Sequence, residues 1–135
     1  MLLSPAELNK LNIQISPGDR IYFYGDLGAG KTTMVQYIIN SLLGIEKAVR
    51  SPTYVYYNKY EKDIYHMDLY RLTSYDEFVS IGGEEIFENQ NTICLVEWPE
   101  IIADHYEPTI IIRIIKPDDR EDVREISIEY KKTIE

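Results

Sequence analysis

Two short stretches of the chain are apolar at nearly every position and lack the alternation of a half-exposed strand. They are Ile-Tyr-Phe-Tyr at residues 21–24 and Thr-Ile-Cys-Leu-Val-Glu at residues 92–97. Runs of this length are typical of strands that are buried on both faces, as in the parallel centre of an α/β sheet. We therefore predict two buried strands at these positions.

A helix is indicated after the first run, because apolar residues recur with the spacing of one helix side at Met34, Val35, Ile38, Ile39, Leu42 and Leu43. Gly44 follows and suits a left-handed helix end. Serine followed three residues later by glutamate, at Ser4 and at Ser74, predicts the start of two shorter helices. The glycine pair 82–83 should interrupt the second of these before another turn or two at residues 84–88.

Two hairpins are predicted by segments rich in tyrosine and β-branched residues. The first joins residues 53–60 to residues 63–71, and the second joins residues 109–116 to residues 123–130 around a charged turn. With 135 residues the chain is long enough for one compact core. We predict an α/β fold over residues 1–135, a single P-loop NTPase-like domain whose mixed sheet has a parallel nucleotide-binding core, added antiparallel hairpins and flanking helices.

Composition restricts the function further. The formal net charge is −9, which repels phosphate backbones and argues against unaided RNA binding. No segment approaches the roughly 20 apolar residues that span a bilayer, so we expect a soluble, cytoplasmic protein without membrane contact. Cys94 is the only cysteine and lies in an apolar run, which predicts a buried, unreactive thiol.

The loop after the first predicted strand carries the clearest chemistry. Gly25, Gly30, Lys31 and Thr32 match the pattern G-x-x-x-x-G-K-[ST], between a strand and a helix as that motif requires. Glycines let the backbone wrap closely around phosphate oxygens, and successive N–H groups form an anion-binding hollow. Lys31 can reach the terminal phosphates, and the Thr32 hydroxyl can bind magnesium. The predicted nucleotide contacts from this loop are Asp26, Leu27, Gly28, Ala29, Gly30, Lys31, Thr32 and Thr33.

A magnesium site needs carboxylate help, usually from a neighbouring buried strand, and two acids are candidates. Glu97 ends the second apolar run, and the following Trp98-Pro99 stops that strand. Asp68 lies in a segment whose alternation places it on one face with His66. A solvated strand end is the alternative for each acid. We predict Lys31, Asp68 and Glu97 as catalytic, and Thr32, Glu97 and Asp68 as metal ligands.

Two other side chains, His66 and Trp98, keep two interpretations each. His66 either orients Asp68 or makes a purely structural hydrogen bond, and we assign it no catalytic role. Trp98 either seals a nucleotide site or packs as a core aromatic. His105 has no acidic or nucleophilic companions in a pattern, which favours a histidine in a surface loop.

Four segments together resemble the TsaE family, also called YjeE. They are GDLGAGKTT at residues 25–33, SPTY at 51–54, HMDLYRL at 66–72 and EWPE at 97–100, and the resemblance covers residues 16–103. Members of that family are small ATPases needed, with the TsaB and TsaD proteins, for threonylcarbamoyladenosine formation at position 37 of tRNAs that read codons beginning with A. The resemblance thus implies ATP and Mg²⁺ as ligands, TsaB and TsaD as partners, and tRNA contact only through their complex.

The resemblance also implies roles for individual residues. The segment 51–53 would be a mobile, switch-like loop near the γ-phosphate, which adds Thr53 to the nucleotide contacts. Thr32 and Glu97 would hold magnesium, and Asp68 would support hydrolysis. Hydrolysis is expected to be slow until a partner completes the site, because no separate arginine-rich lid is evident and a missing arginine finger can withhold roughly 10³ to 10⁵ in rate.

Two other functions remain as alternatives. A small-molecule kinase shares the same loop but normally needs an arginine-bearing lid and an acceptor pocket. A nucleotide-dependent binding switch that reads guanine usually carries an Asn-Lys-x-Asp stretch late in the chain. The nearest analogue here is Asn-Lys-Tyr-Glu at residues 58–61, with a longer acid and an earlier position.

Overall fold

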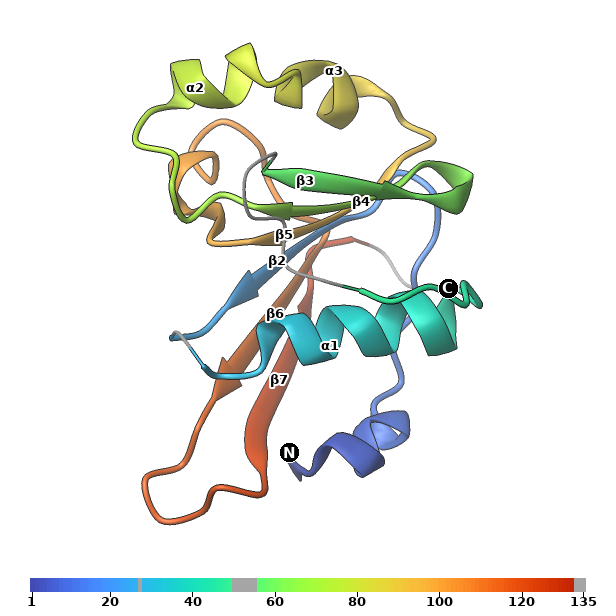
Figure 1. The fold of residues 1–135 in the computed structure, drawn as a ribbon, viewed down its shortest axis with the longest axis vertical. Coiled ribbons are helices and arrows are strands. Elements are labelled where there is room, and N and C mark those ends of the chain that lie inside the picture. Colours follow the sequence, from blue (N-terminus) through green and yellow to red (C-terminus); the bar gives the residue numbers. More distant parts are fainter. Residues whose placement is uncertain (27, 50–55, 133–135) are drawn as a thin grey trace.

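The computed structural model describes residues 1–26, 28–49 and 56–132. The strands of this part of the chain form one seven-stranded sheet in the order β1-β7-β6-β2-β5-β4-β3 (Figure 1). Their bounds are Leu2–Leu3 for β1, Arg20–Tyr24 for β2, Tyr57–Tyr60 for β3, Ile64–Asp68 for β4, Ile93–Glu97 for β5, Ile110–Ile115 for β6 and Arg124–Tyr130 for β7.

The centre of the sheet is parallel. Strand β2 pairs in parallel with β5 on one side and β6 on the other, and β4 pairs in parallel with β5. The outer pairs β3–β4, β6–β7 and β1–β7 are antiparallel. The predicted mixed sheet with a parallel core and added hairpins is therefore confirmed. The first hairpin differs from the prediction in one respect: it is not only an added antiparallel pair, because its strand β4 also pairs in parallel with β5.

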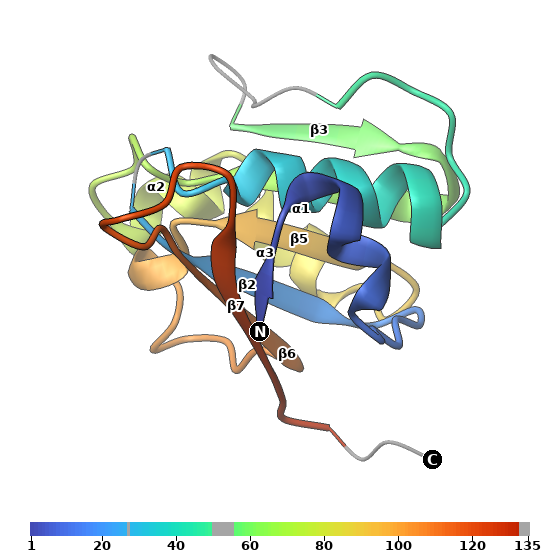
Figure 2. The ribbon, with the colours of Figure 1, turned by 90° about the horizontal axis from the view of Figure 1, so that it is seen from below.

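Helices cover both faces of the sheet (Figures 1 and 2). On one face lie α1 at Lys31–Tyr37, its π-helical continuation η2 at Ile38–Leu42 and the 3₁₀ helix η1 at Pro5–Lys10. On the other lie α2 at Tyr75–Ser80 and α3 at Gly83–Glu88. Short 3₁₀ turns, η3 at Glu61–Asp63 and η4 at Pro99–Ile101, complete the described elements. The predicted capping at Ser4 and Ser74 and the left-handed end at Gly44 are present.

Strand β2 shows why a run without alternation predicts burial on both faces. Ile21 and Phe23 pack into the cluster beneath α1, whereas Tyr22 packs into the cluster beneath α2 and α3. All three side chains have an exposed fraction of 0%. Their burial fixes the end of β2, and with it the start of the glycine loop.

Strand β4 is shorter than predicted, and strand β3 covers the second half of its predicted range. Strand β3 begins at Tyr57, and the predicted positions 53–55 lie outside the described residues. Strand β4 ends at Asp68 because the Asp68 carboxylate accepts a hydrogen bond from the backbone N–H of Tyr70, 3.0 Å away. Such a local side-chain bond competes with strand pairing and turns the chain. Asp68 thereby stands at the carboxyl end of its strand.

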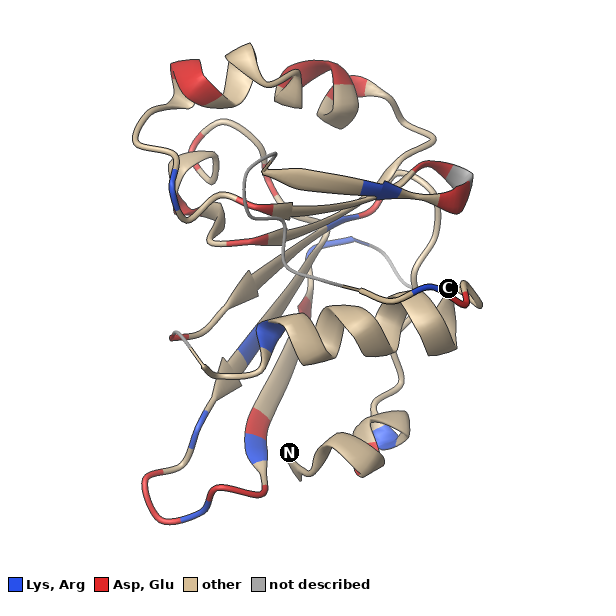
Figure 3. Cartoon of the chain, in the orientation of Figure 1, with Lys and Arg blue, Asp and Glu red and all other residues tan. Residues whose placement is uncertain are grey.

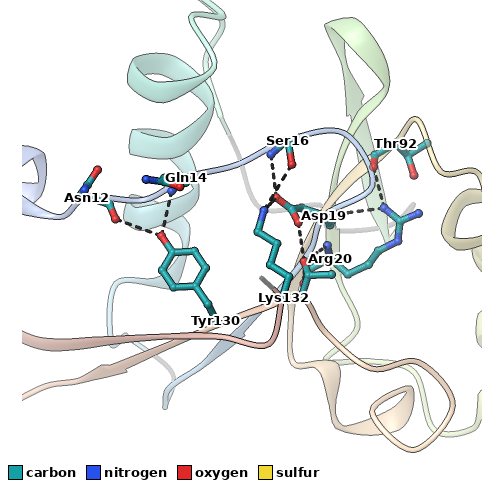
Figure 4. Close-up of polar contacts among 9 residues, drawn as sticks. Asn12, Gln14, Ser16, Asp19, Arg20, Thr92, Tyr130 and Lys132 are labelled. Carbon is teal, nitrogen blue, oxygen red and sulfur yellow. Dashed lines mark hydrogen bonds and ion pairs between the residues drawn. The ribbon is translucent and has the colours of Figure 1, made fainter. Parts of the chain in front are cut away.

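Polar contacts hold the amino-terminal ends of strands β2 and β5, away from the glycine loop (Figure 4). The carboxylate of Asp19 accepts the backbone N–H of Ser16 at 2.8 Å and the ammonium of Lys132 at 2.5 Å. The buried guanidinium of Arg20 donates to the carbonyl of Thr92 at 2.7 Å. These bonds tie the segment after β7 and the start of β5 to the start of β2.

Two predictions from composition can be compared with the structure. Cys94 is buried in β5, and burial raises the pKa of its thiol to about 11, as expected for an unreactive cysteine. Within the described ranges, none of the helices combines the length and apolar character needed to cross a bilayer. The cytoplasmic location remains a prediction.

Candidate functional site

A glycine loop at residues 25–30 leads from the end of β2 into α1. Gly28 and Gly30 have φ angles of +80° and +103°, in the left-handed region that favours glycine. Gly25 has a different constraint, because a Cβ there would lie 2.7 Å from the carbonyl oxygen of Ile114 in β6. All three glycines are thus needed for this loop path. Leu27 lies outside the described residues.

Arg124, the first residue of β7, holds the loop from outside. Its Nε donates to the carbonyl of Ala29 at 2.8 Å, and its Nη1 donates to the carbonyl of Val123 at 2.9 Å. A trans peptide directs its C=O and N–H to opposite sides, so this bond turns the N–H of Gly30 away from the guanidinium. No local pattern in the sequence indicates Arg124, because it meets the loop only through the fold.

Lys31 begins α1 and is buried, with an exposed fraction of 5%. Its Nζ donates to the carbonyl of Gly25 at 2.5 Å and lies 3.5 Å from the centroid of the Trp98 ring. Burial lowers the pKa of Lys31, while the nearby carboxylates of Glu97 and Asp68 act in the opposite direction. The ammonium therefore lies inside the site, between the loop and the acids.

Thr32 and Glu97 meet across the gap between α1 and β5. The Thr32 hydroxyl donates to the Glu97 carboxylate, at 3.2 Å from Oε2 and 3.4 Å from Oε1. The contact follows from topology, since β2 and β5 are adjacent parallel strands whose carboxyl ends share one edge, with Phe23 paired to Glu97. Glu97 is only 3% exposed, so the alternative of a solvated strand end does not hold for it.

His66 joins the same carboxylate from β4. Its Nε2 lies 2.5 Å from Oε2 of Glu97, and the imidazole is fully buried. Of the two interpretations of His66, orientation of Asp68 is wrong, because the imidazole is hydrogen-bonded to Glu97 and not to Asp68. The predicted alternation is right, because Met67 and Leu69 pack into the core beneath α2.

Asp68 is brought beside Glu97 by strand register, in which the two residues are directly paired. The Asp68 side chain is half-buried, and burial is the largest cause that raises its pKa, against the N–H of Tyr70 and the charge of Lys31. The two predicted acids and the predicted lysine thus share one electrostatic environment.

The donor set suits a cation that is bound together with phosphate. Among the described residues, no three His, Cys, Asp or Glu side chains converge closely enough to hold a metal ion by themselves. Magnesium at nucleotide sites usually takes one or two carboxylates and completes its shell with phosphate oxygens and water. Thr32, Glu97 and Asp68 fit that arrangement.

A cleft of about 450 Å³ opens beside the loop and α1, next to Gly30 and Thr33. Its volume is in the range of small-molecule sites. The apolar wall comes from the amino-terminal segment, α1 and the β6–β7 hairpin, with Leu3, Pro5, Leu8, Met34, Ile114 and Ile126. Because these segments are far apart in sequence, no motif indicates the cleft.

The other predicted residues are placed as follows. Asp26 is exposed, and its carbonyl accepts the N–H of Ala29 at 3.0 Å. Trp98 is partly buried at the site itself, where its ring packs on Lys31 and on Tyr70. His105 is exposed and stacks on an aromatic ring of α2, as expected for a surface histidine. Thr53 lies outside the described residues.

The fold and the site together define an α/β protein with one mixed sheet, whose parallel strands present a glycine loop, a lysine and two acids at their carboxyl edge. The family model described as "Threonylcarbamoyl adenosine biosynthesis protein TsaE" matches residues 4–126. The chain belongs to the TsaE family. The match corrects the narrower range predicted from the motifs, since it includes the amino-terminal segment and most of the β6–β7 hairpin.

Similar proteins support this assignment. Three relatives from different bacteria, each named tRNA threonylcarbamoyladenosine biosynthesis protein TsaE, serve as examples. The one from Bacillus subtilis is 39% identical over 111 residues, covering 78% of this chain and 68% of its own length. The one from Haemophilus influenzae is 43% identical over 83 residues, covering 59% and 51%, and the one from Rickettsia conorii is 41% identical over 109 residues, covering 78% and 61%. The chain thus spans about half to two thirds of the length of these relatives.

A solved structure is also similar. The crystal structure of Bacillus subtilis YdiB aligns with a TM-score of 0.58 at 34% sequence identity, covering 83% of this chain and 68% of that one. The likeness supports the architecture of a mixed sheet with parallel core strands.

Proposed function

We propose that this protein is a magnesium-dependent P-loop ATPase that acts with TsaB and TsaD in threonylcarbamoyladenosine modification of tRNA at position 37. The observation that carries the proposal is the contact of 3.2 Å between the Thr32 hydroxyl and Glu97, directly after a glycine loop of the required sequence. A hydroxyl and a carboxylate at this place are what a magnesium–triphosphate complex needs. Family membership supports the tRNA pathway.

In this proposal the loop binds the phosphates of the nucleotide and the cleft binds its base. The backbone N–H groups of residues 28–32 bind the phosphates, and the base enters the cleft that Gly30 and Thr33 line beside the loop. The apolar wall of the cleft suits a purine ring. Adenine is favoured over guanine, because the stretch nearest to a guanine-reading motif forms edge strand β3 and the start of η3, where Lys59 pairs with Asp63.

The residues of the site perform separate tasks in phosphoryl transfer. Lys31 leaves the Gly25 carbonyl and the Trp98 ring to bind the terminal phosphates. Thr32 and Glu97 hold the cation, which when bound neutralises charge that develops on the phosphate oxygens. Asp68, with its raised pKa and its place beside Glu97, orients the attacking water. A partner supplies the remaining transition-state charge, so we expect hydrolysis by the isolated chain to be slow.

The distribution of charge supports the proposal that this chain does not bind tRNA directly. Acidic side chains gather on α2, on α3 and in the loop between β6 and β7 (Figure 3). With a net charge of −9 the surface repels a phosphate backbone, so tRNA is bound by the partners and not by this chain.

Reconstitution of the modification tests the proposal. TsaB, TsaD, tRNA and the activated threonylcarbamoyl donor are combined with wild-type protein, with Lys31→Ala, or with neither. Repeated turnover should require the wild-type protein and ATP, and the Lys31→Ala protein should behave like its omission. Full turnover without this protein, or with the variant, contradicts the proposal. Rapid phosphorylation of a metabolite in a separate screen would instead identify a small-molecule kinase.

A further inference from the structure

A titratable side chain that the proposed mechanism does not use lies directly beneath the site. His66 has an exposed fraction of 0%, and its Nε2 lies 2.5 Å from Oε2 of Glu97. Its other ring nitrogen, Nδ1, has no hydrogen-bond partner within the part of the chain that the structure describes. The imidazole is therefore bound at one end only.

This arrangement reduces the stability of the fold, which a purely structural role for His66 does not explain. A buried polar atom without a partner destabilises the fold, and an apolar side chain of similar size would avoid that loss. The neighbours Tyr65, Met67 and Leu69 pack into an apolar cluster on the opposite face of β4. What an apolar residue at position 66 could not provide is the bond to Glu97.

We propose that His66 is a positioning residue that holds the carboxylate of Glu97 in the orientation that binds the cation. This inference rests on the proposed function, because it concerns the same magnesium–nucleotide site. An ionised carboxylate only accepts hydrogen bonds, so Nε2–H is the donor in the bond to Glu97.

The geometry assigns a task to each group around Glu97. His66 donates a hydrogen bond to Oε2 of Glu97 from β4, and the Thr32 hydroxyl donates to the same carboxylate from α1. A hydroxyl that donates its hydrogen to a carboxylate keeps its oxygen lone pairs for a cation. His66 therefore fixes Glu97, and Glu97 in turn fixes the rotation of the Thr32 hydroxyl. A free glutamate side chain at the end of β5 would lose rotamer freedom only when the cation binds.

Two amide variants test this inference without relying on an apolar replacement. In His66→Gln the side-chain N–H can reach the position of Nε2, whereas in His66→Asn the shorter side chain ends near the position of Nδ1. The measured quantities are the Mg²⁺ concentration that half-saturates tight binding of ADP, by calorimetry, and the ADP affinity in excess chelator. Hydrolysis of ATP and the unfolding temperature are recorded alongside.

Loss of a group that orients a metal ligand typically costs 10- to 100-fold in metal affinity or activity. We expect His66→Asn to raise the half-saturating Mg²⁺ concentration by about 10- to 100-fold, and His66→Gln to stay close to wild type. ADP affinity without Mg²⁺ should be equal in all three proteins. Equal Mg²⁺ dependence in all three, or an equal loss in both variants, overturns the positioning role. A wild-type protein whose ADP binding ignores Mg²⁺ overturns the proposed function itself, which is a different result.

Discussion

The ammonium of Lys31 lies 3.5 Å from the centroid of the Trp98 ring, so the lysine of the glycine loop and the aromatic residue after β5 are in cation–π contact. Trp98 has a φ of +55°, an unfavourable backbone conformation for a bulky residue. Strain of this kind commonly accompanies functional sites. In the proposed mechanism, the ammonium of Lys31 would leave this ring for phosphate when nucleotide binds.

Trp98 should therefore report nucleotide binding. It is the only tryptophan, so its emission can be followed in the wild-type protein. Addition of ADP or ATP with Mg²⁺ should change the emission in a saturable way, because Lys31 leaves the ring. The same titration with adenosine, which lacks phosphate, should leave the emission almost unchanged. An equal response to adenosine would show that the ring senses the base instead of the lysine.

Lys31→Ala should weaken ATP binding more than any other single change in the loop side chains. Hydrogen bonds to charged groups contribute about 1.5–3 kcal/mol, or roughly 10- to 150-fold in affinity. Calorimetry with ATP and Mg²⁺ measures the effect. The exposed Lys47, which pairs with Glu61, supplies the matched control Lys47→Ala.

Glu97→Gln separates metal binding from phosphate binding in the same assay. This variant should keep its ATP affinity in chelator but lose the gain that Mg²⁺ brings, whereas Lys31→Ala should lose affinity under both conditions. Unchanged ATP affinity in Lys31→Ala would remove the lysine from the phosphate site. An unchanged Mg²⁺ effect in Glu97→Gln would remove that acid from the cation site.

Asp68 should make the stability of the ligand-free protein depend on pH. Burial raises the pKa of Asp68, so the folded state holds its proton over a window above the ordinary aspartate pKa of about 3.9, and the free energy of unfolding falls as the pH rises through that window. Asp68→Asn removes this cost and keeps the acceptor for the N–H of Tyr70. Its unfolding temperature should exceed that of wild type at pH 7.5, and the difference should shrink towards pH 4. A constant difference, or a less stable variant at pH 7.5, contradicts this.

Gly83→Ala tests the packing of the helical layer that does not carry the site. A Cβ at Gly83 would overlap the ring of the fully buried Phe78, so alanine should cost about 1–3 kcal/mol of unfolding free energy. Chemical denaturation measures the loss, and Gln36→Ala on the exposed side of α1 should stay within about 0.5 kcal/mol of wild type. Equal stability of the two variants would mean that α3 can shift away from Phe78 at no cost.

Local sequence patterns were enough to predict the elements whose structure depends mainly on residues within one segment. The apolar run of β2, the helical period after Gly30 and the capping serines are short-range signals, and the corresponding elements lie where they predict. The loop motif likewise names Lys31 and Thr32 by their positions alone. Burial of Glu97 follows from its place at the end of a run that is apolar throughout.

The remaining parts depend on register and on contacts between distant segments. His66 reaches Glu97 because β4 pairs in parallel with β5, whereas the sequence by itself only predicts a hairpin there. Arg124 meets Ala29 across 95 positions of the chain, and the cleft is assembled from three separate segments. Periodicity cannot report such pairings, because it describes one strand or helix at a time.

The central claim is that this loop and these acids bind a magnesium–nucleotide complex. A crystal structure with a non-hydrolysable ATP analogue and Mn²⁺, whose anomalous signal locates the cation, tests it most directly. The account predicts phosphates within the loop of residues 25–32, the cation beside Thr32 and Glu97, and the base in the cleft near Thr33. Nucleotide bound elsewhere, or a cation signal away from Thr32 and Glu97, would contradict it.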